Sequence, residues 1–582
     1  MYKIKFKGKE YDASPYQESI FTEIKNGTSN LIINASAGAS KTSTIVNSLQ
    51  FIPNKKKVLY IAFNKDIVET INSLVDRDNC KIATFHSLGR SILIENSVIS
   101  EHTPIDEFKY SNYVRDYIST LGKKMPKKQY NSYLKNVKDL VNYSRYYLSL
   151  SEKEIGKTAA LYGIALIDDE IKVCRDVLLW GKENTDTIDY TDMIWYITVK
   201  NLATRQFRYD WIFVDEIQDM SVMQQSIISK CMKRGCRFVG VGDEEQAINV
   251  WCGSSLQSIE ILKQKSNTKE LQLPISYRCP KSIVKLASKY SNRIKAFDNA
   301  IEGSINYDVS KYAPIGGDMV LCRCTAPLIE LHIEYLQRNK PSYIRGASKI
   351  KDRFIQLCSS SNAKLLDRNC ITSNGFFPEL YSNLFKLIEC VIYNFNLTEE
   401  EAIKHSSVMQ LYDDINGLMA LSEGLLTLDE LVNKINDVLT CNEEQDAIQL
   451  STIHKAKGLE ADNVYILMPS LLPSKLATKD WEIKTEKNLA YVAVTRAKRT
   501  LNYIHEDTFF IRRYVKSSAI SILSELDAIK KKLNYNVEME IKAPSNISSQ
   551  HKTIHKLGET PQKPIELNKK SKKGGQKFGH LL

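Results

Sequence analysis

The chain has 582 residues and a formal net charge of +12, with 43% hydrophobic and 25% charged residues. A chain of this length is too long to fold around a single hydrophobic core, and it predicts about four modules of roughly 150 residues each. The composition excludes a chain that is disordered throughout. No apolar run approaches the ~18 residues of a membrane span and no signal-peptide pattern is present, so we expect a soluble, cytoplasmic protein with no membrane partner.

The twelve cysteines form no CxxC pair. Zinc and iron–sulfur sites use ligands paired at loop spacing, whereas the two nearest cysteines, Cys322 and Cys324, belong to a strand-like run. We therefore expect buried, reduced thiols.

Short apolar, β-rich runs recur along the chain, each followed by a loop and a helical pattern. Continuous apolar strands that alternate with helices indicate parallel sheets covered on both faces. An earlier and a later set predict two α/β cores: Leu31–Ile33, Val58–Ala62, Trp211–Val214 and Phe238–Val241, then Val320–Cys322, Ile448–Leu450 and Val464–Leu467. Residues 91–188 and 352–443 lack this rhythm and predict helical insertions.

A loop of small residues separates the strand Leu31–Asn34 from a helical pattern. It comprises Ala35, Ser36, Ala37, Gly38, Ala39, Ser40, Lys41 and Thr42. Such a loop directs backbone N–H groups and a helix N-terminus at a phosphate, with Lys41 reaching the β/γ-phosphates and Thr42 reaching Mg²⁺. Ala35 and Ser40 occupy the two glycine positions of the pattern GxxxxGK[ST]. An ordinary small-residue turn is therefore an equal alternative for this segment alone.

Two apolar strands end in acidic residues. The strand Ile212–Val214 leads into Asp215 and Glu216, which at the tip of a buried strand suit Mg²⁺ binding and activation of an attacking water. About thirty residues later a second strand ends in the acidic run that contains Gln246, a side chain placed to sense a γ-phosphate. The alternative for each segment is an acidic loop after a strand.

These segments resemble the motifs of the UvrD/Rep/PcrA-type superfamily 1 helicases, especially the shorter bacterial and phage members. The resemblance extends from about Tyr16 to Tyr503. Its motifs are Gln17, Ala62–Lys65, Thr84–Ser87, the DExQD-like Asp215–Asp219, the GDxxQxIxxWxG-like Gly242–Gly253, the NYR-like Pro274–Arg278, the TxHxxKGLE-like Thr452–Glu460 and the YVALTRAK-like Tyr491–Lys498. A single motif has a plain structural interpretation, such as a core tryptophan at Trp251 or a surface ion pair at Arg278 or Arg496. The ordered set favours the family.

The resemblance implies roles for the matching residues. Gln17 reads the adenine edge, Tyr277 stacks on adenine and Glu460 holds the ribose. ATP and Mg²⁺ are the implied cofactors. Catalytic roles are implied for Lys41, Asp215, Glu216, Gln246, Arg278 and Arg496, Mg²⁺ ligands at Thr42 and Asp215, and DNA contacts at Phe63, Asn64, Lys65, Thr84, His86, Trp251, Thr452 and His454.

The implied fold is α/β, with two RecA-like parallel-sheet motor domains and mainly helical insertions. The second insertion must be small, because the segment between Arg278 and Thr452 is short. We place the parts at 1–90 with 189–273 (first motor), 91–188 (first insertion), 274–351 with 444–515 (second motor), 352–443 (reduced insertion), 516–541 (C-terminal helix) and 542–582 (basic disordered tail).

Three positions depart from the family pattern. Ser40 replaces the glycine before the lysine, Ser43 stands where relatives often have an arginine that packs on the adenine, and Cys252 stands where an arginine is usual. We therefore expect Tyr277 and Gln17 to hold the base, and we expect these changes to affect turnover more than the fold.

Two basic segments lie outside the motifs. The first is either a solvated helix face or a DNA contact, and its residues are Lys123, Lys124, Lys127, Lys128, Lys135 and Lys138, near Tyr130 and Tyr133. The second is the tail, which has nine lysines and two glutamates from Lys542 to Leu582. It is either a solubility tail or a contact with nucleic acid or with an acidic replication or repair protein.

The implied function is an ATP-dependent translocase and helicase that moves 3′→5′ on single-stranded DNA and unwinds at ss/dsDNA junctions with little sequence specificity. One alternative is an ATP-gated DNA-binding module with weak turnover, against which the full catalytic set argues. Another is the motor subunit of a helicase–nuclease complex. No acidic constellation suited to a two-metal nuclease follows Tyr503, so the nuclease would be a partner chain.

Overall fold

The computed structural model of the chain describes residues 2–6, 9–63, 65–122, 127–162, 164, 166, 169–248, 267–372, 374–395, 397–439, 446–477, 480–505, 519–533 and 535. Over that part of the chain, no helix combines the length and the apolar character needed to cross a bilayer. Some predicted features lie outside the described residues, namely Asn64, Lys123, Lys124, Trp251, Cys252 and the basic tail 542–582.

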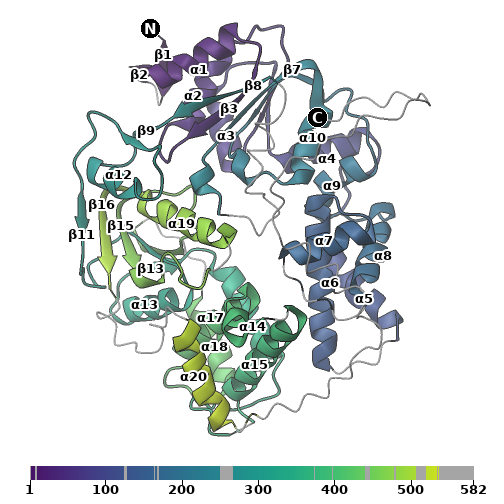
Figure 1. Cartoon of the computed structure of the whole chain (residues 1–582), viewed down its shortest axis with the longest axis vertical. Helices are drawn as coiled ribbons and strands as arrows, with labels where there is room; N and C mark the ends of the chain where they lie inside the picture. Colours follow the sequence, from purple (N-terminus) through teal and green to yellow (C-terminus); the bar gives the residue numbers. More distant parts are fainter. Residues whose placement is uncertain are drawn as a thin grey trace.

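Six parallel strands form the first sheet, in the order β5-β4-β6-β7-β3-β8 (Figure 1). They span Asn30–Ala35 (β3), Val58–Ile61 (β4), Cys80–Ala83 (β5), Tyr209–Val214 (β6), Met232–Gly242 (β7) and Thr268–Leu273 (β8). Strand β4 is wholly buried, as is β3 after its first residue. Burial on both faces is the reason these strands read as continuous apolar runs.

A second sheet of six parallel strands follows the order β11-β16-β15-β12-β14-β13. Its strands are Ser304–Asn306 (β11), Met319–Cys322 (β12), Ser342–Ile344 (β13), Ile448–Thr452 (β14), Ala461–Leu467 (β15) and Ala497–Ile504 (β16). Each of the seven apolar runs predicted above as strands overlaps a strand of one of the two sheets, although Val58–Ala62 extends one residue beyond β4. The predicted α/β class with two parallel-sheet cores is therefore confirmed.

Helices connect the strands of each sheet. Around the first sheet they are α1 (Pro15–Asn26), α2 (Lys41–Ser48), α3 (Lys65–Leu74), α4 (Phe85–Glu95), α9 (Asp192–Val199) and α10 (Val222–Cys231). Around the second they include α12 (Lys281–Ala287), α13 (Ala326–Gln337) and α19 (Asp480–Val494). Between the sheets the chain forms a short parallel pair, β9 (Ile275–Ser276) with β10 (Lys295–Ala296).

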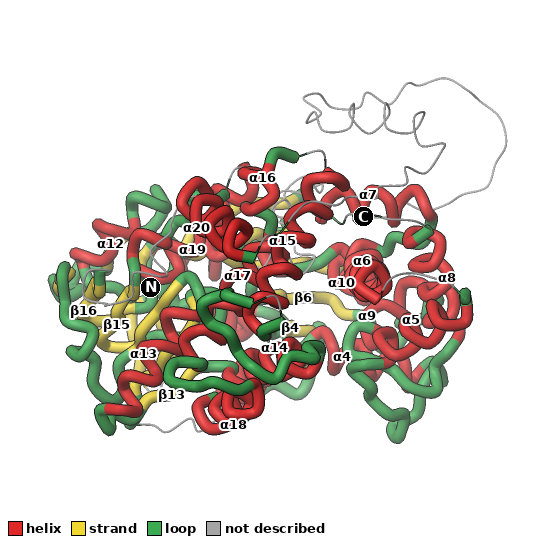
Figure 2. Tube along the Cα trace, turned by 90° about the horizontal axis from the view of Figure 1, so that it is seen from below, coloured by secondary structure: helices red, strands yellow, loops and turns green. Residues whose placement is uncertain are grey.

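The two insertions are helical and form separate groups in Figures 1 and 2. The first comprises α5 (Lys109–Thr120), α6 (Lys127–Tyr147), α7 (Glu152–Tyr162) and α8 (Glu170–Glu183). The second comprises α14 (Ala347–Ser359), α15 (Phe376–Phe395), α16 (Glu399–Ile403), α17 (Ser406–Leu421) and α18 (Leu428–Val438), with α20 (Ala519–Lys532) beside them. Helix α14 thus begins before residue 352, where the sequence pattern placed the start of this insertion.

Each insertion shares a hydrophobic core with the sheet that carries it. Phe354 and Phe385 of the second insertion belong to one buried cluster with Val320 and Leu450 of the second sheet. The first insertion and one face of the first sheet likewise form a single cluster. A shared apolar core resists separation, so each insertion packs firmly on the sheet that carries it.

A buried charge network also fixes the first insertion to the first core. Asp192, at the start of α9, is fully buried. Its carboxylate accepts hydrogen bonds from Lys109 Nζ and from the Tyr110 hydroxyl, each at 2.7 Å. Arg145 Nη1 of α6 lies 2.7 Å from Asp189 and 3.3 Å from Asp192. Removing one partner of such a network leaves an uncompensated buried charge. Asp189 and Asp192 therefore hold the first insertion against the first core.

Candidate functional site

The small-residue loop runs from β3 to α2 and takes an unusual backbone path. Gly38 has φ +72°, and a Cβ on it would lie 2.5 Å from the Cβ of Arg278. Only glycine fits this approach between the two cores. Ser40, at the position where the family has glycine, has φ +56° and therefore keeps the left-handed geometry that glycine favours.

Ser40→Gly is expected to stabilise the chain slightly. The left-handed conformation costs a residue with a side chain roughly 1–2 kcal/mol, and glycine avoids this cost. Glycine also loses more chain entropy on folding, which offsets about 0.5–1 kcal/mol of the gain. We expect the thermal unfolding midpoint to rise by about 1–3 °C, measured by circular dichroism. Ser43→Gly is the matched control, because Ser43 is helical in α2 and its replacement should lower the midpoint. An unchanged or lower midpoint for Ser40→Gly would contradict the strain argument.

The loop faces the acidic end of β6. Lys41 Nζ lies 2.7 Å from Glu216 Oε1, and the Thr42 hydroxyl donates to Asp215 Oδ2 at 3.3 Å. Glu216 has φ +53°, a conformation that side-chain-bearing residues adopt at functional sites held by their surroundings. Thr42 and Asp215 supply the hard oxygen donors that Mg²⁺ prefers, so the residues present fit that ion.

Buried acids gather at this point. Burial, and then Glu216, raise the pKa of Asp215 to about 6. Burial, and then Glu245, raise the pKa of Asp243 to about 8. Burial opposes ionisation of Glu216 as well, but Lys41 and then Lys457 lower its pKa to about 2. An ionised Glu216 beside crowded acids is the arrangement of a base next to a divalent-cation site.

Two arginines of the second core converge on the same place. Arg496 is 1% exposed, and its Nη2 lies 3.4 Å from Oε1 of Gln246 in the first core. Burial, and then Arg278, lower the pKa of Arg496 to about 10. Arg278 Nε pairs with Glu460 at 2.6 Å. Buried guanidinium groups that are not fully paired with carboxylates favour the binding of an anion between the cores.

Gln246 links its own core to the opposite wall. Its Nε2 donates to Asp243 at 2.7 Å, while its side-chain oxygen faces Arg496. Asn488 of α19 donates to the carbonyls of Glu244 and Ala247 at 3.0 and 2.9 Å. The structure thus brings all six predicted catalytic residues to the interface between the two sheets.

The predicted adenine contacts differ in availability. Tyr277 is 42% exposed, and its N–H donates to Gly38 of the phosphate loop at 2.9 Å. Gln17 is buried, and its side chain accepts from the N–H of Ser14 at 3.0 Å and donates to Thr44 at 2.9 Å. Gln17 therefore caps α1 and contacts α2 through its side chain.

The predicted DNA contacts of the first core follow its strands. Phe63, after β4, is 55% exposed, and Lys65, at the start of α3, is also exposed. Thr84 caps α4 by accepting from the N–H of Ser87 at 3.1 Å. His86 is exposed, and its ring lies 6.1 Å from Tyr190. The carboxyl ends of parallel strands share one edge of a sheet, where ligands bind.

In the second core, Thr452 ends β14 and His454 follows it. Burial, and then Arg323, lower the pKa of His454 to about 3, so its imidazole is neutral at physiological pH. Arg323 follows the neighbouring strand β12 and pairs with Glu486 at 2.7 Å. The loop predicted to contact DNA in this core thus lies beside an arginine, Arg323, that is outside the predicted motifs.

Two family models match the chain in succession. The model of the UvrD/REP helicase N-terminal domain matches residues 16–267, and that of the UvrD-like helicase C-terminal domain matches residues 253–507. The chain belongs to the UvrD/Rep/PcrA family of ATP-dependent DNA helicases. The resemblance predicted over Tyr16 to Tyr503 is therefore confirmed.

Curated relatives of this helicase are distant but span most of it. ATP-dependent DNA helicase Rep of Buchnera aphidicola subsp. Acyrthosiphon pisum is 23% identical, with 83% of this chain and 93% of the relative covered. Rep of Buchnera aphidicola subsp. Schizaphis graminum is 22% identical, covering 84% and 92%. ATP-dependent DNA helicase PcrA of Staphylococcus epidermidis is 21% identical, covering 81% and 80%.

One aromatic residue of this helicase that the sequence did not point to lies beside Tyr277, the predicted adenine contact. Phe297 is 37% exposed, and its ring centroid lies 5.1 Å from that of Tyr277. The pairing of β9 with β10 sets them side by side, and the Phe297 N–H donates to Ser276 at 3.2 Å. An aromatic residue after a two-residue strand is a weak sequence signal. Only the pairing of the two strands shows that Phe297 lies beside Tyr277.

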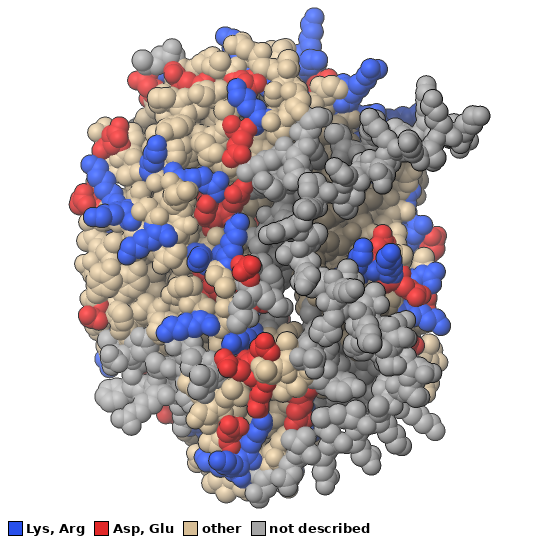
Figure 3. All heavy atoms as spheres, in the orientation of Figure 1, with Lys and Arg blue, Asp and Glu red and all other residues tan. Residues whose placement is uncertain are grey.

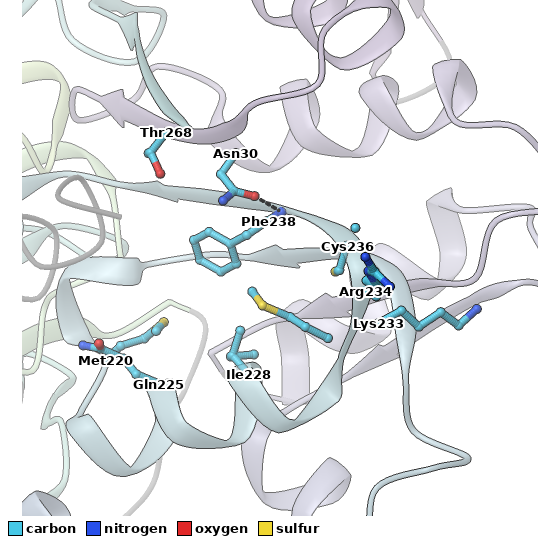
Figure 4. Close-up of a pocket in the computed structure, with 11 residues that line it drawn as sticks. Asn30, Met220, Gln225, Ile228, Lys233, Arg234, Cys236, Phe238 and Thr268 are labelled. Carbon is cyan, nitrogen blue, oxygen red and sulfur yellow. Dashed lines mark hydrogen bonds between the residues drawn. The ribbon is translucent and has the colours of Figure 1, made fainter. Parts of the chain in front are cut away.

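A cavity of about 280 Å³ lies away from these residues, between α10 and the first sheet (Figure 4). Met220, Ile228 and Phe238 give it an apolar lining, and Gln225 and Thr268 each place a buried polar atom without a hydrogen-bond partner near it. None of its lining residues is a predicted site residue. The predicted nucleotide-binding residues therefore lie apart from this cavity, at the interface between the cores.

Proposed function

We propose that the chain hydrolyses ATP to move 3′→5′ along single-stranded DNA and to unwind duplex DNA at ss/dsDNA junctions with little sequence preference. The observation that carries this proposal is the approach of Arg496 to Gln246 across the interface between the cores. The phosphate loop and the acids belong to one core and the arginines to the other. A triphosphate bound there has partners on both walls, and it favours the closed arrangement.

Hydrolysis supplies the power stroke. Glu216, ionised beside Lys41, accepts a proton from the attacking water. Thr42 and Asp215 would hold Mg²⁺, which would neutralise phosphate charge when bound. Arg278 and Arg496 stabilise the charge that develops on the transferred phosphoryl group. Loss of the γ-phosphate removes the contacts that distinguish the closed from the open state, and the cores separate.

Exposed aromatic and basic side chains suit a strand that is held without reading its sequence. Every base has a π face, so stacking on Phe63 is tolerant of sequence. Figure 3 shows basic and acidic side chains interspersed over the visible face, with no single-sign field covering the described surface there. We therefore expect phosphate contacts to be local, and affinity for DNA to fall steeply with salt. The 3′→5′ polarity comes from the family resemblance.

Phe63→Ala is expected to weaken single-stranded DNA binding roughly 5- to 150-fold, because a stacked base contributes about 1–3 kcal/mol. Fluorescence anisotropy with a labelled oligothymidylate measures the Kd at fixed salt. Phe108→Ala is the matched control, since Phe108 is a 65% exposed phenylalanine of the first insertion. Equal Kd values for the two variants would remove Phe63 from the DNA site.

The first test is ATP hydrolysis with and without single-stranded DNA. A large stimulation supports the motor, and displacement of a strand from duplexes with a 3′ or a 5′ tail then tests the polarity. Preference for the 5′-tailed substrate would contradict the 3′→5′ proposal. ATP binding without stimulated hydrolysis would replace the motor by the ATP-gated DNA-binding module.

A further inference from the structure

One lysine of the second core reaches into the catalytic wall of the first. Lys457 Nζ lies 2.5 Å from Asp219 Oδ2 and donates to the carbonyl of Gln246 at 2.7 Å. The Lys457 side chain is 14% exposed and that of Asp219 is 2% exposed. An ion pair this buried is held against water, and it depends on both partners being in place.

The two partners belong to the segments that carry the hydrolytic residues. Asp219 ends the short 3-10 turn Ile217–Asp219 that directly follows Glu216. The Gln246 carbonyl belongs to the residue whose side chain faces Arg496. Lys457 therefore fastens the acid-bearing segment and the sensor segment to each other through one ammonium group.

The loop that carries Lys457 joins the other parts of the predicted motor. It follows Thr452 at the end of β14, where DNA contacts are predicted, and it reaches Glu460, which pairs with Arg278. Arg496 Nη1 donates to the carbonyl of Leu459 in the same loop at 3.1 Å. A displacement of this loop by DNA is thus transmitted to the arginines and to the Lys457 contact together.

A neighbouring lysine shows that a cation in this loop need not cross the interface. Lys455 Nζ donates to the carbonyls of Arg345 and Gly346 at 3.3 and 3.2 Å, both within the second core. That contact survives separation of the cores. The Lys457 contact does not, because its partners lie on the other sheet.

We infer that Lys457 is a positioning residue that sets the hydrolytic segments of the first core only when the DNA-contacting loop of the second core closes on them. This inference rests on the proposed function and names the device that couples DNA binding to ATP turnover. In the open arrangement, Asp219 and the Gln246 carbonyl lose their shared partner. ATP then binds at the phosphate loop without an assembled catalytic wall.

The test compares Lys457→Met, which keeps the aliphatic stem, with Lys455→Met as the matched control. The first readout is the Kd of a non-hydrolysable ATP analogue with and without saturating oligothymidylate, whose ratio measures the coupling. We expect a ratio of roughly 5-fold or more in the wild type, the same ratio in Lys455→Met, and a ratio below about 2 in Lys457→Met. The second readout is the split between kcat and KM, where Lys457→Met should lower the DNA-stimulated kcat about 10-fold or more with KM for ATP within about 3-fold.

Asp219→Asn and the double variant show whether Lys457 acts through Asp219. The coupling ratio of the double variant should be no lower than that of the more impaired single variant, because both substitutions break the same Lys457–Asp219 contact. Lys457→Arg should recover part of the coupling, and thermal midpoints near the wild-type value show that each variant is folded. Wild-type coupling in Lys457→Met, or multiplicative losses in the double variant, would overturn the inference. The analogue experiment needs no turnover, so a wild-type chain without DNA-stimulated hydrolysis fails the proposed function while the coupling ratio still decides on Lys457.

Discussion

Arg496→Ala is expected to lower the DNA-stimulated kcat for ATP hydrolysis by about 10³- to 10⁵-fold, the range in which arginine fingers act in phosphoryl transfer. The guanidinium is buried, lies 3.4 Å from the side-chain oxygen of Gln246 and comes from the opposite core. Its charge therefore acts on the transferred phosphoryl group only after the cores close. Affinity for the ATP analogue should change far less than kcat, because the contact strengthens in the transition state.

Two further variants separate catalysis from folding at this position. Arg496→Lys keeps a positive charge but loses the hydrogen bonds to the carbonyls of Val492 and Leu459, so it should recover only a small part of the rate. Arg499→Ala is the matched control, because Arg499 lies on strand β16, which begins directly after Arg496, and is exposed. Steady-state hydrolysis at saturating single-stranded DNA measures all three. A loss of less than about 10-fold in a folded Arg496→Ala protein would exclude an arginine finger here.

Glu216→Gln is expected to lower kcat by about 10²- to 10⁴-fold while ATP still binds. The carboxylate lies 2.7 Å from Lys41 Nζ and is kept ionised by it, whereas an amide of the same size accepts no proton from water. Lys41 loses its ion partner in this variant and remains available to phosphate, so the Kd for ATP should stay equal to that of the wild type or become lower.

Asp210→Asn is the control for Glu216→Gln, because Asp210 occupies the other end of β6 and pairs with Lys233 at 2.7 Å. Single-turnover hydrolysis and equilibrium binding of ATP measure the rate and the affinity separately. Hydrolysis in Glu216→Gln within 10-fold of the wild type would assign the base to another residue. Loss of ATP binding would mean that Glu216 holds the phosphate loop together with Lys41.

Local chemistry made much of this molecule predictable. A strand, a small-residue loop and a helix N-terminus are contiguous in sequence, so Lys41 and Thr42 could be assigned before the fold was known. Asp215 and Glu216 directly follow a strand whose apolar residues are buried on both faces. Such a strand can be predicted because its sequence is a continuous apolar run. The sheets, the two cores and the family follow from signals of this kind.

Contacts between distant segments were not predictable in the same way. Lys457 and Asp219 are 238 positions apart, and the Tyr491 hydroxyl accepts from the N–H of Ala37, 454 positions away, at 3.0 Å. The spacing of two motifs in the sequence does not predict which of their side chains come into contact when the two cores close. Gln17 shows the same limit, because its motif does not reveal its side-chain contacts with Ser14 and Thr44.

The family, the α/β class, the strands β3, β4, β6 and β7 of the first sheet and β12, β14 and β15 of the second, and the catalytic candidates followed from the sequence alone, because each depends on residues close together in the chain. The tertiary structure alone decided that Ser40 keeps a left-handed backbone, that Phe297 lies beside Tyr277, that each insertion shares a core with its sheet, and that Lys457 crosses between the cores. These features depend on the packing of segments far apart in sequence, where the geometry of the assembled cores selects the partner of each side chain.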